Sequence, residues 1–438
     1  MRFLLDAVYL LLIIVVSPWL IWKSIRTGKY RTGYASKLVG LTPKRDSDST
    51  CIWFHAVSVG EVNLLATLID EVKRQKPDWE CVISTTTITG MELALKKFPG
   101  TTIFFCPLDF SWATRAAVRR IRPDMLVLIE LELWPNLIKS VKSFGASIAV
   151  VNGRLSEHSF VGYCRVRPLV TRLMQKIDLI AAQDHIYADR FMSLGARPES
   201  VQITGSMKYD GAETNRKNPT TVQLQQLAGL LESDVVFLAG STQEPEEEIV
   251  LEVFKRLQAD WPDLRLIVVP RHPERFESVA KMLDESGVAW QRRTLLKQDR
   301  KTDARVLLVD AIGELGAWWG TARIAFVGGS LGNRGGQNMI EPAAYGAAVS
   351  FGPNTRNFRD IVANMLDHDA AIVVNNGSDL TDFARRCLKH PEYADQLGNN
   401  ARQLVANGIG ATERTVSLIV KLADSKQPKA NQQDGCHR

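Results

Sequence analysis

From residue 51 onward the sequence alternates short β-rich runs with stretches of helical pattern, and this alternation constrains the fold more than any other feature. It predicts parallel strands joined by crossover helices. A polar stretch at residues 209–223, YDGAETNRKNPTTVQ, interrupts the alternation before it restarts. We therefore predict an α/β protein with two doubly wound, Rossmann-like domains that face each other across a cleft. The expected strands cover residues 51–54, 81–86, 102–105, 125–131, 147–151, 179–182 and 201–204, then 235–239, 265–269, 305–309, 324–327, 347–351 and 371–374.

An apolar run near the N-terminus, AVYLLLIIVVSPWLIW at residues 7–22, predicts a membrane-anchor helix. At about 1.5 Å per residue it barely covers a hydrocarbon core that needs about 20 residues. Trp19 and Trp22 are aromatic residues typical of a membrane interface. Because Pro18 can break the helix, a helix that lies in one leaflet is an alternative to a span. The run lacks the cleavage site of a signal peptide.

The segment after the apolar run is basic, and by the positive-inside rule it places the rest of the chain in the cytoplasm. It has two interpretations: a topology signal that also binds anionic lipid head groups, or a lining for the approach of a phosphorylated lipid substrate. We expect membrane phospholipid as a partner and no nucleic acid. The cationic residues are Lys23, Arg26, Lys29, Arg31, Lys37, Lys44 and Arg45.

With 438 residues, the chain is too long for one compact core. Its last residues contain too few apolar side chains to order themselves. We expect a membrane anchor at 1–22, a basic juxtamembrane segment at 23–50, an N-terminal domain at 51–214, a C-terminal domain at 215–424 and a disordered tail at 425–438.

The cysteines and histidines do not form a recognisable site. The six cysteines include no C-x-x-C pair, and the seven histidines show no H-E-x-x-H spacing. This pattern argues against a zinc ribbon and a disulfide framework, and it suits a reducing compartment. We expect no metal site and no cofactor.

Carboxylates follow two of the expected strands in the N-terminal half. Ser58 and Glu61 fit the capping-box pattern, in which two side chains satisfy N–H groups at a helix start. Alternatively, Glu61 accepts a proton from a substrate hydroxyl. Glu130 and Glu132 end a strand that is otherwise apolar, and an unpartnered buried carboxylate costs on the order of several kcal/mol. These two need cations, donors or a wet cleft, and Lys208 is a plausible partner for Glu130; an internal ion pair is the structural alternative.

Glycines dominate the stretch after the strand at 324–327, GGSLGNRGGQNMIEP at residues 328–342. Glycines after a strand let backbone N–H groups approach a phosphate, and a helix N-terminus adds partial positive charge. The stretch has neither the P-loop nor the G-x-G-x-x-G pattern, and a simple glycine-rich connection is the alternative. Glu341 could hold a ribose through two hydroxyls. Arg271, after another strand, suits a phosphate or a base edge, or is a solvated residue at a helix start.

Taken together, the motifs HAVSVGE, ELWPN, NGRLS, TGSMKYD, VPRHPERF, FVGGS and GGQN occur in one order along the chain. In this order they resemble the 3-deoxy-D-manno-octulosonic acid (Kdo) transferase family of Gram-negative lipopolysaccharide synthesis. The resemblance implies a two-domain GT-B glycosyltransferase at the inner membrane, with its catalytic domains on the cytoplasmic face. It implies CMP-Kdo as the donor and the phosphorylated, acylated diglucosamine precursor of lipid A as the acceptor. A nucleotide-sugar epimerase or hydrolase of similar fold is the alternative.

The resemblance also implies the roles of particular residues. Glu61 corresponds to the general base, and Glu130 and Lys208 to transition-state stabilisers. Gln337 departs from the histidine expected in G-G-H-N, and Pro342 follows Glu341; both affect only the nucleotide contacts. The number of Kdo units transferred, the acyl-chain preference and the oligomeric state are not evident from the sequence. The implied CMP contacts are Pro270, Arg271, Ile312, Gly313, Glu314, Asn338, Met339, Ile340 and Glu341.

Overall fold

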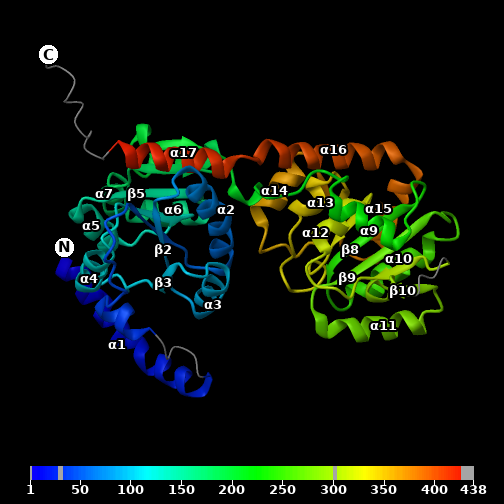
Figure 1. Ribbon diagram of the computed structural model, residues 1–438, viewed down its shortest axis with the longest axis horizontal. Helices are drawn as coiled ribbons and strands as arrows, with labels where there is room; N and C mark the ends of the chain where they lie inside the picture. The colour runs from blue at the N-terminus through cyan, green and yellow to red at the C-terminus, as the bar shows by residue number, and fades with distance from the viewer. Residues whose placement is uncertain (1, 28–32, 299–302, 426–438) are drawn as a thin grey trace, which may run out of the picture. The chain divides into compact units, whose positions relative to one another are not determined.

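The computed structural model describes residues 2–27, 33–298 and 303–425, and these form two compact units (Figure 1). Unit 1 holds the described residues of Met1–Asp210 and Ile409–Arg438, and unit 2 is Gly211–Gly408. Each unit has a seven-stranded sheet in which all pairs of neighbouring strands are parallel. The predicted α/β class, with two doubly wound domains, is therefore confirmed.

The sheet of unit 1 has the strand order β3-β2-β1-β4-β5-β6-β7. Its strands are β1 Cys51–His55, β2 Glu80–Thr85, β3 Thr102–Phe105, β4 Met125–Ile129, β5 Ser147–Gly153, β6 Leu179–Ala182 and β7 Val201–Ile203. Its helices are α1 Arg2–Thr27, α2 Val59–Gln75, α3 Ile88–Lys97, α4 Ser111–Ile121, α5 Pro135–Phe144, α6 Glu157–Arg165, α7 Arg167–Met174, α8 His185–Ser193 and α17 Ala411–Asp424, with the short turns η1 Ala35–Val39, η2 Pro198–Ser200 and η3 Met207–Tyr209.

The sheet of unit 2 has the order β10-β11-β9-β8-β12-β13-β14. Its strands are β8 Val235–Thr242, β9 Leu264–Pro270, β10 Trp290–Arg292, β11 Val306–Leu308, β12 Ile324–Val327, β13 Ala348–Phe351 and β14 Ala371–Val373. Its helices are α9 Pro219–Ala228, α10 Glu246–Leu257, α11 Phe276–Glu285, α12 Leu315–Trp318, α13 Ile340–Ala344, α14 Arg359–Asp367, α15 Gly377–Lys389 and α16 Pro391–Gly408, with the short turns η4 Pro273–Arg275, η5 Arg293–Leu295 and η6 Trp319–Thr321.

One strand of the structure was not expected, and one expected strand ends early. The edge strand β10 was not predicted, because a three-residue strand with the sequence WQR has no apolar run. The strand expected at 125–131 ends at Ile129, since Glu130 takes a left-handed conformation with φ of 58°. The turn at Glu130 ends the ladder before the two carboxylates.

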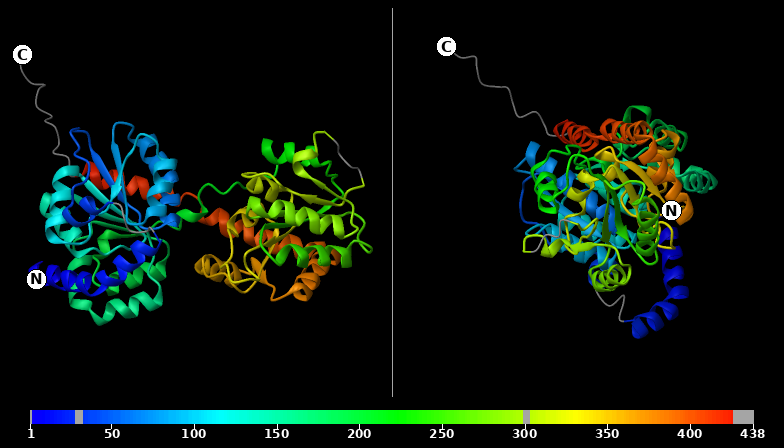
Figure 2. Two further views of the ribbon diagram at one scale, coloured as in Figure 1. Left: turned by 90° about the horizontal axis from the view of Figure 1, so that it is seen from below. Right: turned by 90° about the vertical axis from the view of Figure 1, so that its right-hand side faces the viewer.

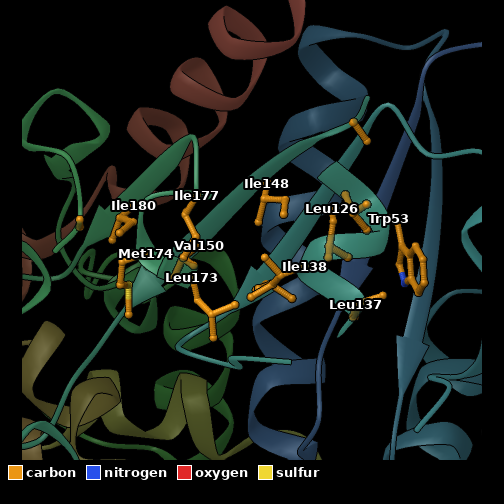
Figure 3. Packing of buried hydrophobic residues seen from close by; sticks show 14 of the residues in the cluster. Trp53, Leu126, Leu137, Ile138, Ile148, Val150, Leu173, Met174, Ile177 and Ile180 are labelled. Atoms are coloured by element: carbon orange, nitrogen blue, oxygen red, sulfur yellow. The ribbon is translucent and has the colours of Figure 1, made fainter. Parts of the chain in front are cut away.

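The core of unit 1 lies on both faces of its sheet. Figure 3 shows one face, where Ile138 of α5 and Leu173 and Met174 of α7 pack against Ile148 and Val150 of β5; all five are buried. The opposite face is covered by α2 and α17. Because both faces are covered, the central strands are apolar throughout, which is typical of parallel sheets.

Helix α17 corrects the expected end of the C-terminal domain. The sequence placed residues 411–424 with unit 2, but α17 packs in unit 1 against α2 (Figures 1 and 2). Its buried residues Val416 and Ile419 join the core that contains Ile52 and Phe54 of β1. A helical pattern does not reveal which core its apolar face joins, so the sequence could not show that the chain returns to unit 1.

The N-terminal helix is longer than the predicted anchor and lies against unit 1. Asp6 is buried and accepts hydrogen bonds from the backbone N and Oγ of Ser111, at 2.9 and 2.6 Å. Tyr9 donates to Asp109 at 3.2 Å and meets Phe110 edge to face. These polar contacts hold α1 on the start of α4.

Among helices in the described ranges, none combines the length and the apolar character that a membrane span requires. Four parts of the predicted segments lie outside the described residues: residue 1 of the anchor, residues 28–32 of the basic segment, residues 299–302 of the C-terminal domain and residues 426–438 of the tail.

Candidate functional site

Each sheet has a central topological switch point. On one side of this point the chain adds strands toward one edge of the sheet, and on the other side it adds them toward the opposite edge. In unit 1 the switch point lies between β1 and β4, and in unit 2 between β8 and β12. Ligands of open α/β sheets bind beyond the carboxyl ends of the strands at such points. Glu61 follows β1 and Glu130 follows β4, so both lie at the switch point of unit 1.

Glu61 occupies the first turn of α2, and its side chain is 8% exposed. Oε2 accepts from the backbone N of Val57 at 2.8 Å, and Oε1 accepts from Oγ of Ser58 at 2.7 Å. The N of Glu61 in turn donates to Oγ of Ser58 at 3.3 Å. This is the geometry of a helix cap with Ser58 as the N-cap residue. The carboxylate of Glu61, however, bonds the backbone N–H of Val57, the residue before the cap. Such bonds also fix the carboxylate in one position.

Glu130 and Lys208 form the ion pair that the sequence suggested. Nζ of Lys208 lies 3.5 Å from Oε1 of Glu130, and each side chain is 29% exposed. Lys208 sits in η3, whose Met207 donates its backbone N–H to Oδ1 of Asn152 at 3.1 Å. Asn152 itself has a φ of 53°. The left-handed conformations of Glu130 after β4 and Asn152 in β5 therefore set the positions of the Glu130 and Lys208 charges.

Glu132 is the third carboxylate of this group. Trp134 donates its Nε1–H to Oε2 of Glu132 at 3.0 Å, and the Trp134 ring meets the edge of His55 with centroids 6.2 Å apart. His55 is fully buried, and its Nδ1 lies 2.9 Å from Oγ of Ser84. Burial lowers the pKa of His55 to about 4, so the ring is neutral near pH 7. A neutral, packed imidazole thus supports the tryptophan that holds Glu132.

The three carboxylates influence one another. Burial raises the pKa of Glu61, and the nearby charge of Glu130 raises it further, while the bonds from Val57 and Ser58 oppose the shift. Burial and the charge of Glu61 raise the pKa of Glu132 to about 7, against the opposing bond from Trp134. Carboxyl groups shifted in this way by burial and like charge are typical of acid–base sites.

The switch point of unit 2 is filled by a buried carboxylate of the chain itself. Glu246, 1% exposed, accepts backbone N–H groups from Gly329 at 2.7 Å and from Ser330 and Leu331 at 2.9 Å each. A Cβ on Gly328 would lie 2.8 Å from Oε2 of Glu246, so only glycine fits there. The expectation that these first glycines bind a phosphate is therefore wrong, since Gly329 donates its N–H to Glu246 and Gly328 donates its N–H to the carbonyl of Gly240 at 2.9 Å.

The later part of the glycine-rich stretch leads to Glu341. Asn338 donates from Nδ2 to Oε1 of Glu341 at 3.0 Å, and its Oδ1 accepts the backbone N–H of Ile340 at 3.1 Å. Burial raises the pKa of Glu341, and the opposing influences are Asn338, the charge of Arg271 and a bond from Trp319. Glu341 also lines a cavity of about 330 Å³ together with Gly316 and Tyr345. The structure thus bonds Asn338 to Glu341 and places Arg271 near enough for its charge to act on that carboxylate.

Comparison with known proteins decides the family. The family described as 3-deoxy-D-manno-octulosonic-acid transferase (Kdo transferase) matches residues 29–211. A 3-deoxy-D-manno-octulosonic acid transferase of Haemophilus influenzae is 33% identical over 372 residues, which cover 84% of this chain and 86% of that protein. The chain belongs to the Kdo transferase family. The predicted family, enzyme class and glycosyltransferase character are confirmed.

Solved structures extend the comparison. The C-terminal CMP-Kdo binding domain of WaaA from Acinetobacter baumannii is 33% identical and covers 42% of this chain and 95% of that chain, with a TM-score of 0.40. A UDP-GlcNAc 2-epimerase from Neisseria meningitidis is 12% identical and covers 85% of this chain and 100% of that chain, with a TM-score of 0.56. The second likeness concerns the fold alone, and it agrees with the GT-B-type architecture expected of a Kdo transferase.

Other residues expected to contact CMP in this Kdo transferase have side chains that are already engaged or buried. The carboxylate of Glu314 accepts two bonds from Arg293, at 2.6 and 2.7 Å, and one from Trp318 at 3.2 Å. Met339 and Ile340 are 0% and 3% exposed. Neither residue therefore presents its side chain to a ligand, and the backbone N–H of Ile340 is already bonded to Asn338.

Among the remaining expected contacts, Pro270 is buried, whereas Arg271 and Ile312 are exposed. Ile312 is 79% exposed, and Gly313 has a φ of 88°. Pro270 ends β9, and Arg271 after it donates its backbone N–H to the carbonyl of Thr242 at 3.0 Å. The loop between β11 and α12 and the side chain of Arg271 after β9 are therefore open to a nucleotide.

Several residues of the site were not predicted from the sequence to act there. His55 and Trp134 stand within the motifs HAVSVGE and ELWPN, so their position beside Glu61 and Glu130 was the available signal. Glu246 follows a strand and sits among other glutamates, and nothing in its local pattern distinguishes it from them. Its role depends on contact with a segment more than eighty residues away.

Proposed function

We propose that this protein transfers Kdo from CMP-Kdo to a hydroxyl of the phosphorylated, acylated diglucosamine precursor of lipid A, with inversion at the sugar centre and release of CMP. Membership of the Kdo transferase family supports the donor and the reaction class. The observation that carries the mechanism is the fixed carboxylate of Glu61 at the switch point of unit 1, beside the Glu130–Lys208 ion pair.

In this mechanism Glu61 is the general base. An acceptor hydroxyl attacks the anomeric carbon of Kdo, the bond from that carbon to the CMP phosphate breaks, and Glu61 takes the hydroxyl proton. The raised pKa of Glu61 strengthens it as a base while its two donors keep it in place. Inversion needs one such carboxylate and no covalent intermediate.

Lys208 and Glu130 stabilise the charge that develops in the transition state. The transition state carries oxocarbenium character, as in other glycosyl transfers. Lys208 offers a partly exposed ammonium, and Glu130 holds it in position at 3.5 Å. Fixed charges of this kind stabilise a transition state without reorganisation. The CMP moiety is assigned to Arg271, Asn338 and Glu341 of unit 2, where a carboxylate can accept two ribose hydroxyls.

The proposal includes the inner membrane, with α1 as the attachment and the catalytic units on the cytoplasmic face. Leu11, Ile14 and Val15 of α1 are 63%, 66% and 68% exposed, while Asp6 holds the start of the helix on unit 1. A helix that exposes an apolar face in this way is suited to the boundary between head groups and acyl chains.

Substitution of Glu61 by glutamine tests the mechanism. The amide oxygen can still accept one of the two capping bonds but the amide cannot take the proton, so we expect turnover to fall about 10²- to 10⁴-fold with CMP binding retained. Purified protein, CMP-Kdo and the tetraacyl acceptor are incubated, and the product is followed by mass spectrometry. Free Kdo in the absence of acceptor would instead favour a hydrolase.

The matched control is Asp184→Ala, since Asp184 caps α8 with a bond from Tyr187 at 2.8 Å. It should lower stability by about 0.5–2 kcal/mol and spare activity. If Glu61→Gln likewise spares activity, Glu61 is only a cap and the proposed mechanism is wrong.

A further inference from the structure

A polar cavity of about 440 Å³ in unit 2 is separate from the cavity at Glu341, and its lining residues have no role in the site described above. It lies beyond the carboxyl ends of the neighbouring strands β12 and β13, where ligands of parallel sheets bind. A loop after β12, a loop after β13 and the first residue of α14 line it. The lining includes Asn333, Gly335, Asn354, Thr355, Arg356 and Arg359.

The two loops are bonded to each other, so the cavity is formed in advance. Backbone N–H groups of Asn354 and Asn357 donate to the carbonyls of Ser330 and Gly335, each at 3.0 Å. Gly335 has a φ of 92°, and a Cβ there would lie 2.6 Å from Cγ of Arg356. A side chain at position 335 would clash with Arg356, so only glycine there allows Arg356 to lie against this loop.

The charge of the cavity is positive. Arg356 donates from Nη2 to the carbonyl of Asn333 at 3.1 Å, which holds its guanidinium against the first loop. Among the ion pairs of the described residues, none involves Arg356 or Arg359. A guanidinium presents several donors in a planar fork that matches a carboxylate. Two of them beside a polar cavity indicate an anionic ligand.

We propose that this cavity holds the sugar of the donor, with Arg356 and Arg359 binding the carboxylate of the octulosonic acid. This inference rests on the proposed function and names the part of unit 2 that recognises the sugar acid. The volume lies within the range of small-molecule sites. Asn333, Asn354 and Thr355 add the amide and hydroxyl groups that sugar hydroxyls require.

The double variant Arg356→Gln/Arg359→Gln tests the inference. Loss of two charged contacts to a carboxylate should raise KM for CMP-Kdo about ten- to hundredfold. The inhibition constant of CMP, which lacks the sugar acid, should change less than about twofold. Arg356→Lys/Arg359→Lys keeps the charge and should recover part of the loss. Arg385→Gln is the matched control, since Arg385 is an exposed arginine of unit 2 paired with Asp382, and it should leave both constants unchanged.

The other outcomes overturn the inference in distinguishable ways. If the KM for CMP-Kdo and the inhibition constant of CMP rose by the same factor, the cavity would bind the nucleotide phosphate. If only the KM for the lipid acceptor rose, the cavity would bind a lipid phosphate. Unchanged constants would mean that the cavity binds none of them. Kdo transfer by the unsubstituted protein in the same assay tests the proposed function separately, because that activity does not depend on which group fills this cavity.

Discussion

Each of the three carboxylates after β1 and β4 has a different partner, and the partner determines its chemistry. Glu61 is held by a backbone N–H and a serine hydroxyl, Glu130 by Lys208, and Glu132 by Trp134. Burial and the charge of Glu61 raise the pKa of Glu132 to about 7, and burial raises the pKa of Glu61 as well. Environments that push the pKa values of neighbouring groups apart separate their roles.

Lys208→Met removes the only charge paired with Glu130 among the ion pairs of the described residues. We expect kcat to fall about a hundredfold or more, since a fixed charge aimed at a developing charge is typically worth that much. Lys76→Met is the control, because Lys76 makes an ion pair of 3.0 Å with Asp424 in the same unit and its side chain is similarly exposed. Steady-state kinetics with both variants would contradict the role of Lys208 if the two losses were equal.

Glu132→Gln should make stability less dependent on pH. Burial and Glu61 raise the pKa of Glu132 to about 7 in the folded state, above the value near 4.5 of an unperturbed glutamate. The folded state therefore holds this proton more tightly, and the resulting stability is present below about pH 4.5 and is lost as pH rises through about 7. The glutamine variant should melt at a higher temperature than the unsubstituted protein at pH 8 and close to it at pH 5. Calorimetry at the two pH values measures this, and an equal shift at both would contradict the raised pKa.

At this scale the sequence predicted where these carboxylates lie in the fold but not how they are held. Glu61 and Glu130 follow strands, and the rule for ligand sites in α/β sheets placed both of them. The pairing of Glu130 with Lys208 was proposed from residue type and holds. The bond from Trp134 to Glu132 and the support from His55 depend on side-chain packing, which no local pattern encodes.

At the scale of secondary-structure elements, the loop after β12 and the start of α10 are held together by one carboxylate. The carboxylate of Glu246 does for the N–H groups of the loop what a bound phosphate does in other glycine-rich loops. The sequence led us to expect a bound phosphate at these glycines, whereas the group found there is a carboxylate of the chain itself. A sequence pattern cannot distinguish an internal carboxylate from an external phosphate, because both need the same backbone geometry.

Glu246→Ala should therefore destabilise unit 2 strongly. It leaves the N–H groups of Gln243, Gly329, Ser330 and Leu331 without their acceptor, and we expect a loss of about 3 kcal/mol or more in the free energy of unfolding. Glu248→Ala on the same helix is the control, since Glu248 is exposed and should change stability by less than about 0.5 kcal/mol. Urea unfolding of both variants gives the comparison. Equal, small effects would show that water replaces the carboxylate.

For the whole molecule, unit 2 is an insertion within unit 1. The chain leaves unit 1 after Asp210 and returns at Ile409. The carboxylate of Asp210 closes this junction by accepting the backbone N–H groups of Gly410 and Thr412 at 2.6 and 2.5 Å. The predicted linker near residue 215 lies close to the exit, whereas the return crossing was not foreseen from the sequence.

Removal of residues 409–438 should consequently unfold unit 1 rather than unit 2. The deletion strips Val416 and Ile419, both fully buried, from the core beside β1 and removes both donors to Asp210. Burial of such side chains is worth about 1.5–3 kcal/mol each, so their joint loss is a large fraction of the stability of a domain. Deletion of 426–438 alone is the control, because it leaves α17 whole. Hydrogen exchange read by mass spectrometry should show protection lost in β1 and α2 and kept in β8 and β9. Loss of protection in β8 and β9 instead would mean that α17 stabilises unit 2, as its place in the sequence suggested.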